Sequence, residues 1–408
     1  MIYDVLVIGG GPAGCKAAEL AGKAGMKVVL FEKEQLGGVC LNYGCIPTKS
    51  LLHGIKLYSQ MKNDAPFFGV TASEIVVDPN ILWQRAEQTK NRLRSALRYR
   101  LENSHVNIIQ GEAQWKCKHS GIFEVSCCGQ IFCGQHLILA TGGHPHIPDI
   151  AGIRRGLQNG FVATPRELLK TPNVPQSLVI LGGGAIGMEF ATIYSGLGAK
   201  VTVIEKESSI GGGVDGRISS FLLEVYRKRG VTFELSTVAT CIDGKRLYLQ
   251  NGKHLNTDKI LLACGWESAL KQCCLNNLHV IGDANGKAFS APAAELEAEC
   301  ALRKILGQPD KRSYDFPHVI FTTPEVACWG QTLQQAKVVD PQATEVITPL
   351  SVSSRYAIEH PTDNGFCIKV FSEKGILIGL HIIGTGAAEL LSSVTKIPIH
   401  PSLSELID

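Results

Sequence analysis

Two cysteines stand close together near the amino terminus of this 408-residue chain. Four residues separate Cys40 from Cys45, so the pair can close a small disulfide loop, and Lys49 follows it. A thiolate is stabilised at the amino terminus of a helix and beside a lysine, both of which lower its pKa. The spacing therefore predicts a redox-active pair at the start of a helix. A structural disulfide or two inert thiols is the alternative interpretation.

A glycine-rich loop occurs twice. An apolar run at 5–8 leads into Gly-Gly-Gly-Pro-Ala-Gly at 9–14, and a similar run at 178–181 leads into Gly-Gly-Gly-Ala-Ile-Gly at 182–187. Each copy has the form G-x-G-x-x-G and is followed roughly 20 residues later by an acid at the end of another apolar run. These acids are Glu32 and Glu205. Such glycines let backbone N–H groups approach a pyrophosphate at a helix amino terminus, and the acid bonds the ribose. Two complete copies predict two dinucleotide sites rather than two turns without a ligand.

Glu205 also indicates which nicotinamide cofactor is used. A carboxylate at this position bonds the ribose 2′-OH of NAD and repels the 2′-phosphate of NADP. Lys206 follows it and weakens this inference, because its cation lies next to the carboxylate in the chain. We expect NAD.

The elements that must position these residues follow from the apolar pattern and from proline and glycine. Pro145 and Pro148 mark a hinge into the second glycine-loop unit. The remaining patterns predict a long helix over 79–102, short strands over 112–133, a strand at 137–139, a return to the first unit at 280–283, a helix over 291–306, and strands at 366–371 and 376–383 within a separate α+β domain.

Composition limits the class of protein. The chain is 45% hydrophobic, contains 43 glycines and has a net charge of +3. These values are typical of a globular α/β protein and do not indicate nucleic acid or an anionic membrane as the main partner. We find no apolar run long enough to span a bilayer and no signal peptide. We therefore expect a cytoplasmic protein.

Fourteen cysteines is a high number, but their spacing does not resemble the disulfide framework of a secreted protein. The adjacent pairs Cys127–Cys128 and Cys273–Cys274 suggest a metal or redox role. No Cys or His partner stands at metal-ligand spacing, however. We interpret both pairs as ordinary strand or loop residues and predict no metal site.

The cysteine segment resembles a known family. Residues 37–49 have the form G-G-x-C-x-N-x-G-C-x-P-x-K of the class I pyridine nucleotide–disulfide oxidoreductases, and they are most similar to the dihydrolipoamide dehydrogenases. Further resemblances extend over nearly the whole chain, and they are Ala-Thr-Gly at 140–142, Gly-Asp at 282–283, Thr-Pro-Glu-Val-Ala at 323–327, Ser-Arg-Tyr-Ala at 354–357 and His-Pro-Ser-Leu-Ser-Glu at 400–405.

The resemblance implies a fold of the α/β class. It consists of two Rossmann-like dinucleotide-binding domains, as in glutathione reductase, and a C-terminal α+β dimerisation domain. The implied boundaries are a discontinuous FAD-binding domain at 1–148 and 265–312, an NAD-binding domain at 149–264, and a shortened interface domain at 313–408.

The resemblance also implies roles for the reactive residues. Cys45 is the thiolate stacked against the flavin, and Cys40 is the outer thiol that exchanges with the substrate. Lys49 lies near flavin N5 and pairs with Glu189.

A histidine near the C-terminus completes the implied site. His400, oriented by Glu405, acts as acid and base on the disulfide of the other subunit. An imidazole that titrates near neutral pH suits thiol exchange, and a carboxylate fixes its tautomer.

The cofactor contacts that we predict fall in two groups. The residues expected at FAD are Gly9, Gly11, Pro12, Ala13, Gly14, Glu32, Lys33, Gly38, Val39, Lys49, Glu112, Ala113, Thr141, Gly142, Asp283 and Ala291. The residues expected at NAD are Gly182, Gly184, Ala185, Ile186, Gly187, Glu189, Glu205 and Gly265.

The chain departs from the family pattern in four places. Trp266 and Glu267 follow Gly265 where the family has Arg-x-Pro, and Gly282-Asp283 arrive early, so a flavin-domain strand and loop are missing. An interface helix before His400 is shortened, and the usual tail after Glu405 is absent. Pro292 replaces a histidine common in dihydrolipoamide dehydrogenases.

These observations lead to one main hypothesis and two rivals. We expect an FAD enzyme that transfers electrons between a dithiol or disulfide, the lipoyl group, and NAD, acting in cell redox homeostasis. Its expected partners are a lipoyl-bearing protein or a small disulfide and a second copy of the chain. The rivals are another family member, such as a glutathione or mercuric reductase, and a catalytically impaired flavoprotein paralogue.

Overall fold

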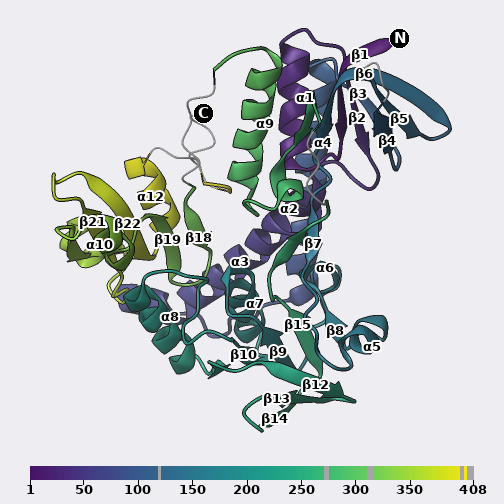
Figure 1. Ribbon diagram of the computed structural model, residues 1–408. Helices are drawn as coiled ribbons and strands as arrows, with labels where there is room; N and C mark the ends of the chain where they lie inside the picture. Colours follow the sequence, from purple (N-terminus) through teal and green to yellow (C-terminus); the bar gives the residue numbers. More distant parts are fainter. Residues whose placement is uncertain (118–120, 271–274, 310–315, 396–398, 402–408) are drawn as a thin grey trace. The chain divides into compact units, whose positions relative to one another are not determined.

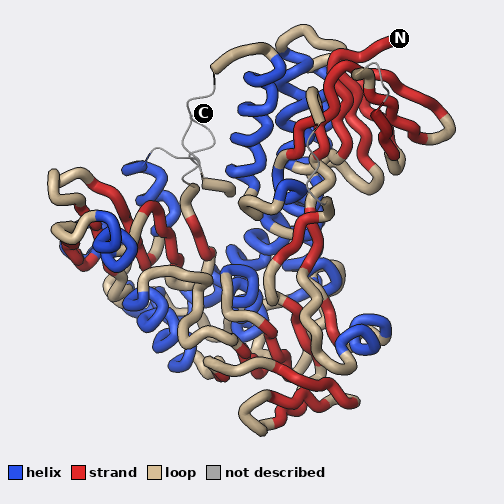
Figure 2. Tube along the Cα trace, viewed as in Figure 1, coloured by secondary structure: helices blue, strands red, loops and turns tan. Residues whose placement is uncertain are grey.

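The computed structural model describes residues 1–117, 121–270, 275–309, 316–395 and 399–401. Its helices and strands form two compact units (Figures 1 and 2). The first unit comprises Met1–Pro47, Ala86–His146 and Trp266–Tyr314. The second unit comprises Thr48–Arg85, Ile147–Gly265 and Asp315–Asp408. The boundaries of the three expected domains stay a prediction.

The first unit is built on a sheet with the strand order β3-β2-β1-β6-β5-β4, in which β17 also pairs with β6. Strands β1, β2, β3, β6 and β17 pair in parallel, and β4 and β5 are antiparallel. β2 is buried along its whole length, as expected for a central parallel strand. The bounds are β1 Ile2–Ile8, β2 Val28–Glu32, β3 Asn107–Gln110, β4 Gln114–Cys117, β5 Phe123–Cys127, β6 Gln130–Leu139 and β17 Leu278–Val280.

Two helices lie side by side in this unit, namely α1 (Pro12–Lys23) and α9 (Ala291–Ile305) (Figure 1). Both contribute buried alanines to the same core, which lets their backbones approach closely. These alanines are Ala13, Ala17, Ala18, Ala21, Ala294, Ala298 and Ala301. The other elements here are α2 (Gly38–Tyr43), the two-stranded sheet of β7 (Gly143–Pro145) and β16 (Trp266–Ser268), and the 3₁₀ turn η3 (Gly282–Asn285). The boundary between the units falls within α3 (Cys45–Ser59) and α4 (Pro79–Asn103).

The second unit contains a parallel sheet with the order β11-β10-β9-β15-β8. Its core is made of branched aliphatic side chains from β9, β10 and β15 together with the adjoining small sheet β12-β13-β14. The strand bounds are β8 Val162–Ala163, β9 Ser177–Leu181, β10 Lys200–Ile204, β11 Thr232–Glu234, β12 Ala239–Asp243, β13 Arg246–Leu249, β14 His254–Asn256 and β15 Lys259–Leu262. The helices are α5 Ile153–Gln158, α6 Pro165–Leu168, α7 Ala185–Gly196 and α8 Gly216–Lys228, and the turns after α3 are η1 Gln60–Asp64 and η2 Ala65–Phe68.

An antiparallel sheet of five strands forms the C-terminal part of the same unit, in the order β18-β19-β22-β21-β20. Helix α12 packs on it through Ala387, Ala388 and Leu391. The strand bounds are β18 His318–Ile320, β19 Glu325–Gly330, β20 Thr344–Pro349, β21 Phe366–Phe371 and β22 Leu377–Gly384. The helical bounds are α10 Leu333–Val339, η4 Leu350–Val352, α11 Ser354–Glu359 and α12 Ala387–Thr395.

Several of the predicted elements are confirmed, but the strand expected at 137–139 is the end of β6, which runs without a break from Gln130. The long helix is α4, the helix over 291–306 is α9, and the two C-terminal runs are β21 and β22. Residues 269–277 connect β16 to β17, and residues 271–274 of this connection lie outside the described part of the chain. Among the described residues, no helix is both long and apolar enough to cross a membrane.

Candidate active site

The two cysteines of the redox segment belong to two consecutive helices. Cys40 lies in α2, and Cys45 is the first residue of α3. Both are half-buried. Because Cys45 stands at a helix amino terminus, the helix dipole favours the thiolate over the thiol. The sequence expectation of a cysteine at the start of a helix is confirmed.

A buried asparagine fastens the loop between these cysteines. Asn42 donates from Nδ2 to the carbonyl oxygens of Leu36 and Gly38, at 3.0 and 2.9 Å. Its Oδ1 accepts from Nε and one terminal nitrogen of Arg94, at 3.1 and 2.8 Å. Asn42 thus links α2 both to the backbone of the segment around it and to the side chain of Arg94, and these bonds hold the helix in place. No residue pattern predicts the contact between Asn42 and Arg94, although Asn42 belongs to the motif at 37–49.

The first glycine loop is shaped so that only glycine fits two of its positions. Gly9 has φ +105°, and a Cβ there would lie 2.2 Å from the carbonyl oxygen of Ala140. A Cβ on Gly14 would lie 1.9 Å from the carbonyl oxygen of Gly9. The close contact draws the start of α1 against the end of β1 and leaves its first N–H groups available for an anion.

Glu32 stands beside this loop at the end of β2. Its carboxylate is buried, and its two oxygens accept from Gly10 N and Glu34 N, each at 2.6 Å. A carboxylate oxygen has more than one acceptor site, so both can still bind ribose hydroxyls. These residues fit a bound dinucleotide.

The second glycine loop repeats this geometry. Gly182 has φ +106°, and its Cβ would lie 2.2 Å from the carbonyl oxygen of Ala263, while a Cβ on Gly187 would lie 1.9 Å from the carbonyl oxygen of Gly182. Glu205 accepts from Gly183 N at 2.6 Å and from Glu207 N at 3.0 Å. The second unit therefore also has residues that fit a dinucleotide.

Lys206, which weakened the inference for NAD, has an acidic neighbour. Its Nζ lies 3.7 Å from a carboxylate oxygen of Glu207, and both side chains are exposed. The positive charge next to Glu205 is therefore partly compensated, although an exposed pair of this kind is weak.

Asp283 lies in η3, in the first unit. Burial, with a smaller contribution from the nearby Glu297, raises the pKa of Asp283 to about 6. Glu297 is buried on α9 and accepts from Gly282 N and from Asn285 Nδ2, each at 2.6 Å. Glu297 therefore holds the turn that presents Asp283, a role for which no sequence motif gave a signal.

Lys49 and Glu189 form an ion pair in the second unit. Lys49 Nζ lies 2.9 and 2.8 Å from the two carboxylate oxygens of Glu189 and 4.9 Å from the centre of the Phe321 ring. Phe321 N also donates to Glu189 at 3.1 Å. The side chain of Glu189 is 5% exposed, so the charged hydrogen bonds of this pair are largely shielded from solvent.

The other expected contact residues are located by the elements that carry them, and their contacts with a cofactor stay a prediction. His400 is half-buried and belongs to the second unit, and Glu405 lies outside the described residues. In the first unit, Lys33 follows β2, Glu112 and Ala113 lie between β3 and β4, Thr141 and Gly142 follow β6, and Ala291 begins α9. In the second unit, Gly184 precedes α7, Ala185 and Ile186 begin it, and Gly265 follows β15. Gly11, Pro12, Ala13, Gly38 and Val39 lie in or next to the segments already described.

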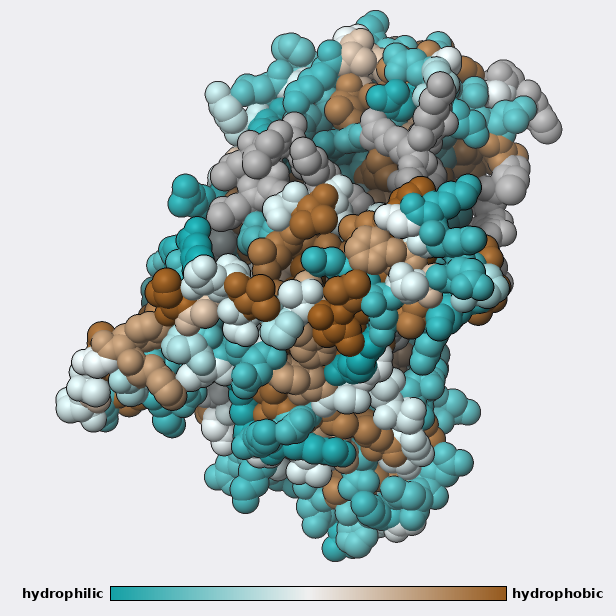
Figure 3. All heavy atoms as spheres, turned by 90° about the vertical axis from the view of Figure 1, so that its left-hand side faces the viewer, coloured by the Kyte–Doolittle hydropathy of each residue, from teal (hydrophilic) through white to brown (hydrophobic). Residues whose placement is uncertain are grey.

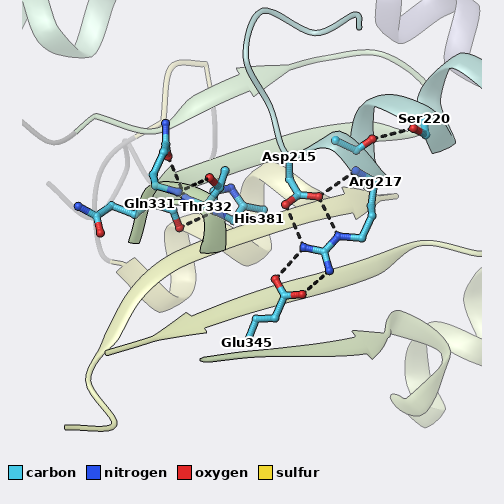
Figure 4. Close-up of polar contacts among 9 residues, drawn as sticks. Asp215, Arg217, Ser220, Gln331, Thr332, Glu345 and His381 are labelled. Atoms are coloured by element: carbon cyan, nitrogen blue, oxygen red, sulfur yellow. Dashed lines mark hydrogen bonds and ion pairs between the residues drawn. The ribbon is translucent and has the colours of Figure 1, made fainter. Parts of the chain in front are cut away.

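A charged cluster joins the parallel sheet region of the second unit to its C-terminal sheet (Figure 4). Arg217 of α8 donates to Asp215 Oδ1 and Oδ2, both at 3.0 Å, and with both terminal nitrogens to Glu345 of β20. Burial raises the pKa of Asp215, but the hydrogen bonds from Arg217 outweigh it and the pKa lies below its usual range. No sequence motif predicts this cluster.

Comparisons with known proteins agree with this architecture. Residues 3–283 match the family model described as pyridine nucleotide-disulphide oxidoreductase, and residues 316–397 match the dimerisation domain of the same family. The chain is 28% identical to a dihydrolipoyl dehydrogenase of Mycoplasma pneumoniae, over 100% of this chain and 97% of the relative. It is 33% identical to a dihydrolipoyl dehydrogenase of Acholeplasma laidlawii, over 74% of this chain and 96% of the relative.

Solved structures show the same fold at lower identity. LpdA from Mycobacterium tuberculosis superposes with a TM-score of 0.85 at 20% identity, covering 99% of this chain and 98% of that one. The HOCl-induced flavoprotein disulfide reductase RclA from Escherichia coli gives a TM-score of 0.82 at 24% identity, covering 99% and 98%.

Proposed function

We propose that this chain, a member of the class I pyridine nucleotide–disulfide oxidoreductase family, oxidises or reduces the lipoyl group. The cofactors of the family are FAD and NAD(H). The fold is that of glutathione reductase, with its dinucleotide-binding and dimerisation domains. The observation that carries the proposal is the half-buried pair Cys40 and Cys45, with Asn42 fixing the loop between them and Cys45 at a helix amino terminus.

Two findings favour the lipoyl group over other disulfides. The motif around the cysteines resembles that of dihydrolipoamide dehydrogenases, and relatives of that name align with the whole chain. Glutathione reductase is disfavoured because Glu205 opposes NADPH. A cytoplasmic location stays a prediction.

The proposed chemistry is thiol–disulfide exchange. In the direction of lipoyl reduction, the Cys40 thiolate attacks one lipoyl sulfur, forming a mixed disulfide and releasing the other sulfur as a thiolate. Cys45 then attacks Cys40, which closes the Cys40–Cys45 disulfide and releases the second lipoyl sulfur. His400 donates the proton that each leaving thiolate needs. Bound FAD would return the two electrons to the pair from NADH.

The proposed preference for NAD rests on Glu205. Its carboxylate is held by two backbone N–H groups, so it cannot swing away from a ribose without losing both bonds. A 2′-phosphate at that position would meet a fixed negative charge. Glu207 adds a further acid nearby and offsets Lys206.

We also propose that the protein acts as a homodimer. The C-terminal sheet and its helices match the dimerisation domain, and apolar side chains gather on the face that carries them (Figure 3). Exposed apolar residues of these elements are Val338, Val339, Val346, Ile347, Val352, Ile358, Leu390 and Val394. Burial of such residues is what drives stable association.

A steady-state assay tests the substrate and the cofactor together. Purified protein is supplied with NADH or NADPH and with lipoamide or glutathione disulfide, and oxidation of the nicotinamide is followed. The proposal expects turnover with NADH and lipoamide well above the other three combinations. Faster turnover with glutathione disulfide than with lipoamide would contradict the proposal and indicate that the protein is another member of the family.

The shortened segments favour one rival, an impaired paralogue. The alignment with the Mycoplasma relative is 450 positions long, whereas this chain has 408 residues. Comparing lipoamide turnover with NADH oxidation by an artificial acceptor on one preparation separates the two. Fast reduction of the artificial acceptor without reduction of lipoamide would show that the protein is an impaired paralogue.

A further inference from the structure

The hairpin between β5 and β6 carries two adjacent cysteines that the proposed reaction does not use. Cys127 pairs with Gln130 across the hairpin, so Cys128 and Gly129 form a two-residue turn. Both turn residues have positive φ, 51° and 75°, which is the pattern of a type I′ turn, for which Asn-Gly is favoured. Cys128 therefore adopts a left-handed conformation that is strained for a cysteine.

This conformation brings the two sulfur atoms together. Neighbouring side chains in a strand point to opposite faces, yet the Sγ atoms of Cys127 and Cys128 are only 3.7 Å apart. Cys127 is buried and Cys128 is exposed. A reagent in solvent therefore reaches the pair through Cys128.

A glycine leaves the space that the two thiols occupy. A Cβ on Gly111 would lie 2.6 Å from the sulfur of Cys128 and 2.7 Å from that of Cys127. The Cys128 thiol also donates to the carbonyl oxygen of Gln110 at 3.4 Å. Both sulfur atoms therefore lie between the hairpin turn and the residues at the end of β3, Gln110 and Gly111.

A single bridging atom suits this pair better than a direct disulfide. Consecutive Cα atoms lie about 3.8 Å apart, whereas disulfides usually join Cα atoms roughly 4.4–6.8 Å apart. An atom inserted between the sulfurs enlarges the ring and relieves this limit, and thiolates prefer soft centres. We propose that Cys127 and Cys128 form a dithiol site for trivalent arsenic, in addition to the Cys40–Cys45 pair.

Binding of a monosubstituted arsenical is a condensation. With phenylarsine oxide, Cys128 adds first and Cys127 closes the ring. Two S–H bonds break and two As–S bonds form, and both protons leave with the oxide oxygen as water. Arsenic stays trivalent and neither sulfur is oxidised, so no further reagent is needed. The closed ring should resist displacement by a monothiol such as glutathione.

The test removes the redox pair first. In a Cys40→Ser/Cys45→Ser background, native protein is treated with phenylarsine oxide, washed with excess glutathione, and weighed by intact mass spectrometry. Three further changes are compared in this background: Cys127→Ser, Cys128→Asn and, as a matched control on the same hairpin, Cys133→Ser. Cys128→Asn restores the favoured Asn-Gly turn, so the hairpin and FAD content should be preserved.

The proposal expects one fewer phenylarsenic group per chain in both the Cys127 and Cys128 variants, and no change with Cys133→Ser. A phenylarsenic group bound at any other cysteine is present in the parent and in all three variants, so it does not affect the difference between them. The same number of groups in Cys128→Asn as in its parent, or complete removal by glutathione from the parent, would overturn the proposal.

Discussion

Replacing Asp283 with asparagine should stabilise the FAD-free protein while weakening its hold on FAD. Asp283 sits in η3, and burial raises the pKa of its carboxyl from the ordinary 3.8 to about 6. Its ionised form is therefore disfavoured in the folded chain. That ionised form is also the one we expect to accept a bond from the ribityl chain of FAD.

The size and sign of the effect follow from this pKa. A rise of about two units corresponds to roughly 3 kcal/mol of unfolding free energy. Because the folded pKa is raised, the favourable contribution is complete below about pH 4 and is lost as the pH rises through about 6. Asp283→Asn has no charge to disfavour, so it should exceed the wild type by about 3 kcal/mol above pH 6 and equal it below pH 4.

His279 provides a control with the opposite dependence. Burial, with a smaller contribution from the neighbouring His136, lowers the pKa of His279 to about 4. Its contribution to stability is present above about pH 6.5 and is lost as the pH falls to about 4. His279→Gln should therefore flatten the acid side of the stability profile, whereas Asp283→Asn should change the neutral side.

Both variants are measured by urea unfolding of FAD-free protein at several pH values between 4 and 8, with FAD affinity measured separately by fluorescence quenching. The reasoning is refuted if Asp283→Asn is no more stable than the wild type at pH 8. It is equally refuted if the gain is the same at pH 4 and pH 8, because a pH-independent gain cannot come from the carboxyl.

Three further outcomes follow from the site. Glu205→Gln should reduce the preference for NADH over NADPH by about 10–100-fold in kcat/KM, which corresponds to roughly 1–3 kcal/mol; unchanged discrimination would show that other residues select the cofactor. Glu189→Gln should lower the free energy of unfolding by on the order of 2 kcal/mol, because Lys49 loses a charged acceptor, and urea unfolding measures the loss. Arg217→Lys should cost about 1 kcal/mol in the same assay, close to Arg217→Met, because lysine cannot bond Glu345 with two nitrogens; full stability of the lysine variant would contradict this.

The sequence predicted the parts of the fold that depend on local pattern. Gly9 and Gly182 were recognisable because strand, glycine loop, helix and acid follow one another within about 30 residues. The structure shows why the pattern is so strict, since a Cβ at either position would overlap a backbone carbonyl. α4 and β21 were equally predictable from periodicity alone.

The contacts that fasten the site were not predictable in this way. Arg94 meets Asn42 across 52 positions in the sequence, and Arg217 meets Glu345 across 128. Such pairs depend on how whole elements pack, and arginine and glutamate are common on any helix or strand surface. Glu297 is a similar case. Nothing in the sequence of α9 marks this glutamate, and its hydrogen bond with Gly282 N depends on how α9 packs against the turn.

The same limit explains the interpretation of the cysteine pairs. The sequence indicates that Cys127 and Cys128 are ordinary strand or loop residues, because no Cys or His partner stands at metal-ligand spacing. Only the positive φ of Cys128 brings its sulfur toward that of Cys127. A backbone conformation of this kind in a residue other than glycine leaves no trace in a residue pattern.

The most direct test of the central claim compares Cys40→Ser and Cys45→Ser with the wild type in one experiment. FAD content is measured from the absorbance spectrum, and NADH–lipoamide turnover and NADH oxidation by an artificial acceptor are measured on the same samples. We predict that both variants keep their FAD and their acceptor activity and lose lipoamide reduction, because each lacks one thiol of the exchange. Near-normal lipoamide turnover in either variant would contradict the assignment of Cys40 and Cys45 as the redox pair.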